Sequence, residues 1–290
     1  MSDISEGKNK EFSSIKELKS GSKLLPLDKP LVMGILNITP DSFYDGSKFL
    51  SETAILRHAE KMLNDGATFI DVGGYSSRPD AKEVPLADEL LRVVPVIETL
   101  TKQFPEAVLS IDTFRSEVAK QSVEAGAALV NDISAGMLDK NMLTSVATLQ
   151  VPYCMMHMRG TPQTMQTLAT YNNVTQEVLY YFSGRIAAAR KAGINDILAD
   201  PGFGFAKTID QNFELLRTLD LFKSLDIPIL VGLSRKSMIY KTLGVTQQEA
   251  LNGTTALHSI ALLKGASILR VHDVKEAVEV VQLMQSMDVH

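Results

Sequence analysis

The sequence has no tryptophan, a single cysteine and few aromatic residues, which make up only 6% of its 290 positions. One cysteine can form neither an internal disulfide nor a cysteine-based metal cage, so we expect a reducing, cytoplasmic location. No segment approaches the ~20 consecutive apolar residues that span a membrane. The polar residues 1–28 also lack the apolar stretch of a signal peptide.

Positive charge is scarce as well. Lysine and arginine number 29 against 34 acidic residues, which gives a net charge of −5. The chain has no basic block of the kind that marks a nucleic-acid-binding face, so we expect no nucleic-acid partner. An acidic chain attracts anions poorly, and an anionic substrate would therefore need a local group of cations.

Short apolar runs repeat along the chain from Leu31 onward, each followed by a turn and a segment with helical spacing. The runs cover residues 31–39, 68–74, 107–113, 128–134, 151–158, 196–202, 227–234 and 267–272. Their continuous apolarity is typical of parallel strands that are buried on both faces. Eight strand–helix repeats in this length predict an α/β fold, a (β/α)8 TIM barrel, with a doubly wound open sheet as the structural alternative.

The domain organisation is simple. No linker rich in proline and glycine and no shift in composition divides the chain beyond residue 31. We therefore predict a single barrel domain over residues 29–290 and a flexible, polar N-terminal tail over residues 1–28.

Polar residues inside the apolar runs are the strongest sign of function, because an unpartnered polar group is costly to bury. Asp112, Asn131 and Asp200 occupy such positions near the carboxyl ends of predicted strands, where TIM barrels place their active sites. Together with Lys236 they could hold a flat heterocycle with alternating donors and acceptors. Alternatively, these acids pair with Lys236 and Arg235 in a salt-bridge network at the barrel mouth.

Cations end the last predicted strand. Arg270 and His272 would neighbour Asn37, at the end of the first strand, once the barrel closes. A guanidinium and an imidazole can bind a diphosphate, and the Asn37 amide can give a neutral oxygen ligand to Mg²⁺. This local group would serve an anionic substrate despite the net negative charge.

Eight motifs occur in order from the first predicted strand to the C-terminal region. They are GILNITPDSFYDG, DVGGYSSRP, SIDTFRSEVA, VNDISAG, MHMRGTPQTMQ, DPGFGFAKT, GLSRKS and GTTALHSIALLKGASILRVHDV. In these motifs the chain resembles the dihydropteroate synthases, pterin-binding enzymes with a (β/α)8 barrel. The resemblance implies a transferase of folate biosynthesis that joins 6-hydroxymethyl-7,8-dihydropterin diphosphate to 4-aminobenzoate, giving 7,8-dihydropteroate and diphosphate.

The resemblance also implies roles for individual residues. The pterin ring would contact Asp112, Asn131, Met156, Asp200, Phe205, Gly232 and Lys236. The diphosphate would meet Asn37, Arg78, Arg270 and His272, with Mg²⁺ on Asn37. The 4-aminobenzoate site would use Phe43, Asp45, Ser77, Arg78, Pro79 and Ser237. Asp112, Lys236, Asn37, Arg270 and His272 would form the catalytic set, and the enzyme would be a homodimer.

Two loops depart from the usual family pattern. Where the family commonly has DSFSDGG and GGESTRP, this chain has Tyr44 and Ser47 in the first loop and Tyr75 and Ser77 in the second. Both tyrosines are bulky, and Tyr75 replaces an acid. We therefore expect the shape of the 4-aminobenzoate pocket, and with it sulfonamide binding, to differ.

Two other functions are compatible with a pterin-binding barrel. One is a methyltransferase that acts on a methylated folate, whose substrate has no diphosphate. The other is a non-catalytic pterin-binding protein. Neither needs the cations of the SRKS and RVH segments, so their presence favours the synthase.

Overall fold

The computed structural model describes residues 17–20, 23–38, 48–75 and 83–287. Its centre is a sheet of eight parallel strands in the order β8-β7-β6-β5-β4-β3-β10-β9. The bounds are β3 (Leu31–Asn37), β4 (Phe69–Gly73), β5 (Val108–Asp112), β6 (Leu129–Asp132), β7 (Tyr153–Met156), β8 (Ile197–Asp200), β9 (Leu230–Val231) and β10 (Ile268–Val271). A parallel bridge between Ala199 and Ile229 joins β8 to the segment before β9 and brings the two ends of the sheet together.

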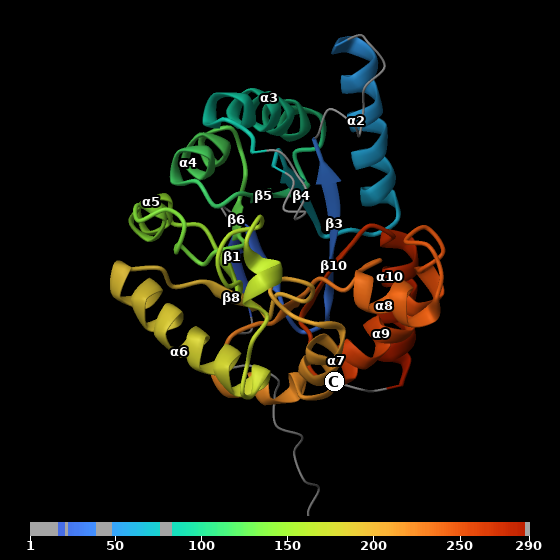
Figure 1. Cartoon of the computed structure of the whole chain (residues 1–290). Coiled ribbons are helices and arrows are strands. Elements are labelled where there is room, and N and C mark those ends of the chain that lie inside the picture. The colour runs from blue at the N-terminus through green and yellow to red at the C-terminus, as the bar shows by residue number, and fades with distance from the viewer. Residues whose placement is uncertain (1–16, 21–22, 39–47, 76–82, 288–290) are drawn as a thin grey trace, which may run out of the picture.

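Helices surround the strands, as Figure 1 shows. They are α2 (Lys48–Asn64), α3 (Leu86–Gln103), α4 (Ser116–Glu124), α5 (Met142–Leu149), α6 (Val174–Ala192), α7 (Ile209–Arg217), α8 (Ser237–Leu243), α9 (Leu251–Leu263) and α10 (Val274–Ser286). The described residues also form two 3-10 helices, η1 (Met165–Leu168) and η2 (Leu219–Leu225). Each predicted apolar run contains one of the eight strands, so the (β/α)8 prediction is confirmed and the open doubly wound sheet is wrong.

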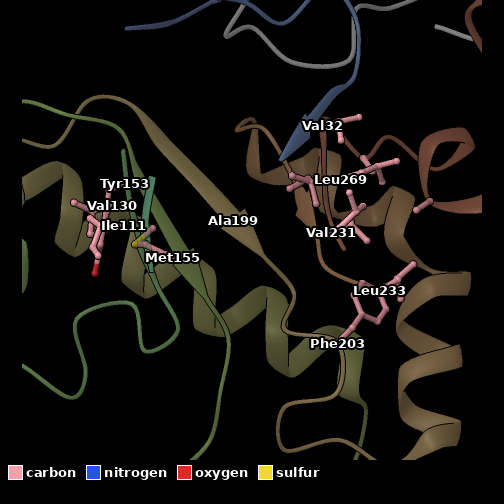
Figure 2. Packing of buried hydrophobic residues seen from close by; sticks show 14 of the residues in the cluster. Val32, Ile111, Val130, Tyr153, Met155, Ala199, Phe203, Val231, Leu233 and Leu269 are labelled. Atoms are coloured by element: carbon pink, nitrogen blue, oxygen red, sulfur yellow. The ribbon is translucent and has the colours of Figure 1, made fainter. Parts of the chain in front are cut away.

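The alternation of side chains along each strand separates two layers of core. Ile111, Val130 and Leu269 belong to the cluster between the strands and the helices, part of which Figure 2 shows. The residues one position away face the barrel interior. Near the amino ends of the strands this interior is apolar, and Cys154 is one of its buried members. The part of the barrel interior near the carboxyl ends of the strands is polar.

A β-hairpin lies in the segment for which a flexible tail was predicted. Strands β1 (Glu17–Ser20) and β2 (Lys23–Pro26) pair in an antiparallel register, and Leu18 is 0% exposed. Leu18 packs with the apolar residues of the barrel interior, so the hairpin covers the amino ends of the strands. The prediction is therefore wrong for the hairpin, because one leucine buried there stabilises an otherwise polar segment. Residues 1–16 lie outside the described part of the chain.

None of the helices among the described residues is long and apolar enough to cross a membrane.

Candidate active site

The predicted pterin residues and, apart from Arg78, the predicted anion residues lie at one end of the barrel. Because all eight strands are parallel, their carboxyl ends lie together at the barrel mouth. The side chains that project from these ends into the mouth are those of Asn37, Asp112, Asn131, Met156, Asp200, Arg270 and His272. Gly232 follows β9 and leaves room there, since a Cβ on it would meet only the Asp200 Oδ2 atom, 3.9 Å away.

An ion-pair network crosses the mouth. Arg270 donates from Nη2 to Asp112 Oδ2 at 2.7 Å and from Nε to Asp71 Oδ2 at 2.6 Å. The Arg270 and Asp112 side chains are 20% and 18% exposed, and Asp71 is fully buried. Burial raises the pKa of Asp112 to about 7, Arg270 opposes this shift and Asp71 adds to it. The two carboxylates raise the pKa of Arg270 although burial acts to lower it.

Asp71 is a site residue that the sequence predictions missed. Besides Arg270, it accepts a hydrogen bond of 3.0 Å from Asn131 Nδ2, and thus connects two predicted substrate residues. The signal was present, because Asp71 lies inside the apolar run 68–74 just as Asp112 lies inside 107–113. The cost of burying an unpartnered carboxylate applies equally to both.

Lys236 reaches the mouth from the turn before α8. Its ammonium donates to the Phe203 carbonyl oxygen and lies 4.3 Å from the centre of the Phe205 ring. Burial lowers the pKa of Lys236 to about 8, and Asp200 and Asp112 oppose the shift. Burial also raises the pKa of Asp200, which the Gly202 N–H, donating to Asp200 Oδ1 at 2.8 Å, counteracts.

The turn after β8 requires glycine at its second position. Gly202 has a φ of +72°, and a Cβ there would lie 2.0 Å from the His157 carbonyl oxygen. Buried Lys207 also holds this turn, donating to the carbonyl oxygens of Gly202 and Phe205 at 2.9 and 3.0 Å. Lys207 thus holds the backbone of the turn that carries Phe205.

Asn37 and His272 flank the ion-pair network. A Cβ on Gly73 would lie 3.6 Å from both Asn37 Oδ1 and Asp112 Oδ2, so these oxygens face each other across the glycine. The Ser234 hydroxyl lies 3.0 Å from His272 Nδ1 and accepts from the His272 backbone N–H at 3.1 Å. Partial burial, with Arg270 beside the ring, lowers the pKa of His272.

Tyr75 forms an aromatic edge beside the mouth. It packs edge-to-face on Phe114 with ring centres 5.1 Å apart, and Arg115 lies over both rings. Gln163 donates to the Tyr75 hydroxyl at 3.0 Å, which joins the segment after β4 to the one after β7. An acid at position 75 would make none of the ring contacts.

The predicted salt-bridge network takes a different form from the one expected. Arg235 forms a two-bond pair with Asp273, with both distances 2.8 Å, and Lys236 makes its hydrogen bond to a carbonyl. It is Arg270 that neutralises Asp112. The alternative in which the acids pair with Arg235 is therefore wrong, since Arg235 points toward the segment before α10.

Several predicted residues lie outside the described part of the chain. They are Phe43, Tyr44, Asp45, Ser47, Ser77, Arg78 and Pro79, so most of the predicted 4-aminobenzoate site stays a prediction. Ser237, also assigned to that site, is the first residue of α8 and directly follows Lys236.

Comparisons with known proteins identify the family. The model of the family described as "Pterin binding enzyme" matches residues 33–272. A dihydropteroate synthase of Escherichia coli K12 is 46% identical over 264 residues, covering 90% of this chain and 93% of that protein. A Yersinia pestis dihydropteroate synthase, solved with a sulfonamide drug complex, superposes with a TM-score of 0.88 at 42% identity and covers 94% of this chain and all of that one. A Xanthomonas albilineans dihydropteroate synthase with 4-aminobenzoic acid also has a TM-score of 0.88, at 40% identity, with 94% and 98% of the two chains covered.

Proposed function

This chain belongs to the pterin-binding enzyme family, and we propose that its barrel mouth binds a dihydropterin diphosphate with the ring among Asp112, Asn131, Asp200 and Lys236. The chain is a transferase of folate biosynthesis that forms 7,8-dihydropteroate from this substrate and 4-aminobenzoate. The observation that carries the proposed binding mode is that Asp112, Asn131 and Asp200 lie near the carboxyl ends of β5, β6 and β8, with Lys236 close enough to Asp200 and Asp112 for their charges to act on it. These groups match the donors and acceptors along a pterin edge.

The ion-pair network accounts for the chemistry. When the bond between the pterin methylene carbon and the diphosphate oxygen breaks first, a positive charge develops on the dihydropterin and a negative charge on the leaving group. Asp112 stabilises the cation electrostatically, and Arg270 and His272 stabilise the departing diphosphate. Arg270 offers its guanidinium to the anion while it holds Asp112 in place. The amine nitrogen of 4-aminobenzoate then attacks the methylene carbon and gives up one N–H proton to the departing diphosphate or to water.

We propose Mg²⁺ as the cofactor. Among the described residues no three His, Cys, Asp or Glu side chains form a metal cage. The Asn37 Oδ1 atom, facing Asp112 across Gly73, is a hard oxygen donor that suits an ion with few protein ligands. Such an ion would supply further charge stabilisation to the diphosphate.

A homodimer is the proposed assembly. Ile260 and Leu263 on α9, and Leu283 on α10, are 38%, 49% and 67% exposed, and the two helices pack against each other. Ala277, Val281 and Met284 on α10 are buried against the barrel, so these positions are not available to a partner. A second copy of the chain would cover the exposed set. The cytoplasmic location is likewise a proposal, which the single free, buried Cys154 supports.

The function is tested with the purified protein, 6-hydroxymethyl-7,8-dihydropterin diphosphate, 4-aminobenzoate and Mg²⁺. We expect dihydropteroate and diphosphate in equal amounts, and loss of both in Lys236→Ala. Lys241→Ala, which removes an exposed lysine of the adjoining helix α8, is the control and should keep the activity. Pterin binding without product under any divalent cation would contradict the synthase function and favour a non-catalytic binding protein.

A further inference from the structure

Asp71 lies in the barrel interior on β4, two residues before Gly73, and is completely buried. The resemblance assigns it no role, yet both residues that it contacts carry one. Its Oδ2 atom accepts from Arg270 Nε at 2.6 Å and from Asn131 Nδ2 at 3.0 Å. A buried carboxylate between two substrate residues does more than balance one charge.

The first consequence concerns the amide of Asn131. An ionised carboxylate is an acceptor only, so the group of Asn131 that faces Asp71 must be the NH₂. Flipping the amide would place its oxygen against the carboxylate and replace an attraction with a repulsion. Asp71 therefore fixes the Asn131 oxygen on the opposite side, where it accepts a hydrogen bond from a bound heterocycle.

The second consequence concerns the guanidinium of Arg270. Asp71 accepts the Nε–H hydrogen bond and Asp112 accepts one from Nη2, so two carboxylates on neighbouring strands hold the plane of the guanidinium in one orientation. With Asp112 alone, Arg270 would keep one bond and could rotate about it. Asp71 thus fixes the direction in which the Nη1 group points.

We propose that Asp71 is a positioning residue that sets the orientation of the Asn131 amide and of the Arg270 guanidinium, and so determines which donor–acceptor edge of a heterocycle the site accepts. The inference rests on the proposed pterin binding. It goes further in assigning the discrimination between heterocycles to a carboxylate that does not touch the ligand.

Calorimetry with two probes tests the proposal. 6-Hydroxymethylpterin has an oxygen at position 4, whereas 2,4-diamino-6-hydroxymethylpteridine has an amino group there and presents an altered edge. In Asp71→Asn, whose own side chain offers either a donor or an acceptor, the Asn131 amide can flip. We expect the pterin affinity to fall roughly 10- to 100-fold, as for the loss of a hydrogen bond to a charged group. The preference for the pterin over the diamino compound should fall toward unity.

The ratio of the two affinities separates positioning from a general structural role. If Asp71→Asn only loosened the barrel, it would weaken the binding of both probes equally and leave the ratio of their affinities unchanged. That result would overturn the proposal. In the Asn131→Ala background, Asp71→Asn should change the ratio less than it does in the wild type, since only the Arg270 guanidinium is then left for Asp71 to position. A full further change there would also contradict the proposal.

Glu89→Gln is the matched control. Glu89 is also fully buried and pairs with one arginine, Arg115 at 2.7 Å, whose 17% exposure resembles the 20% of Arg270. Because Glu89 contacts neither Asn131 nor Arg270, the ratio of affinities should stay as in the wild type, whatever the loss in melting temperature. If the wild-type protein discriminates between the probes but forms no dihydropteroate, only the proposed function is contradicted. If Asp71→Asn keeps the wild-type ratio of affinities, only the inference about Asp71 is overturned.

Discussion

Replacement of Arg270 by methionine tests the ion-pair network most directly. Arg270 is the only cation that the described structure pairs with Asp71 or Asp112, and Asp71 is fully buried. Removing one partner of a buried ion pair costs ~3–5 kcal/mol, because the remaining charge stays without compensation. At roughly 2–4 °C per kcal/mol for a chain of this size, the melting temperature should fall by about 6–20 °C.

The loss should depend on pH. Burial already raises the folded-state pKa of Asp112 to about 7, and Arg270 is the group that opposes this shift. Without Arg270, the folded variant takes up a proton more readily than the unfolded chain, so its stability falls as the pH rises. The difference in unfolding free energy from wild type should therefore be smaller at about pH 5 than at about pH 8.

Urea unfolding of wild type, Arg270→Met and Asp71→Asn/Arg270→Met at both pH values measures these effects. The double variant should regain much of the stability, because both members of the buried pair leave together. A single variant as stable as wild type at pH 8 would refute the reasoning. The same would follow from a double variant that loses the sum of the two single effects.

Three further predictions follow from other parts of the structure. Lys236→Ala should weaken binding of 6-hydroxymethylpterin by ~1–3 kcal/mol in calorimetry, the usual cost of orphaning a buried polar partner, and an unchanged affinity would place Lys236 outside the pterin site. Leu18→Ala should lower the unfolding free energy by ~2–5 kcal/mol in urea, since it leaves a cavity under the barrel; a loss below ~0.5 kcal/mol would mean that the hairpin does not cover the interior in solution. Asp112→Asn should gain stability relative to wild type as the pH rises from about 4 to about 7. In this range unfolding of the wild type releases the proton that folded Asp112 retains, and a higher pH favours that release. Parallel stability curves for these two proteins would contradict the raised pKa of Asp112.

Local patterns were sufficient to predict the eight strands. Apolar runs such as 128–134 and 196–202 have the length and composition of buried parallel strands wherever they occur, so each could be recognised without its neighbours. The same runs revealed Asn131 and Asp200, because a polar residue inside an apolar run can be recognised from the sequence alone.

Contacts between distant segments could not be predicted in this way. The hairpin around Leu18 carries few apolar residues of its own, and its burial depends on the open amino end of a barrel that the rest of the chain builds. Tyr75 contacts Gln163 only because the segments that follow β4 and β7 meet above the mouth.

The sequence by itself determined the barrel and the set of polar groups at its mouth, because periodicity and burial cost act within single strands. Only the tertiary structure decided which of those groups pair. Arg270 and Asp71 are 199 positions apart, and Arg270 and Asp112 are 158 apart. Their pairing depends on strand register and on which side chains face the interior of the closed barrel. Ion pairs form between charges that lie close together in the folded structure, and the separation of two residues along the chain does not tell whether they do.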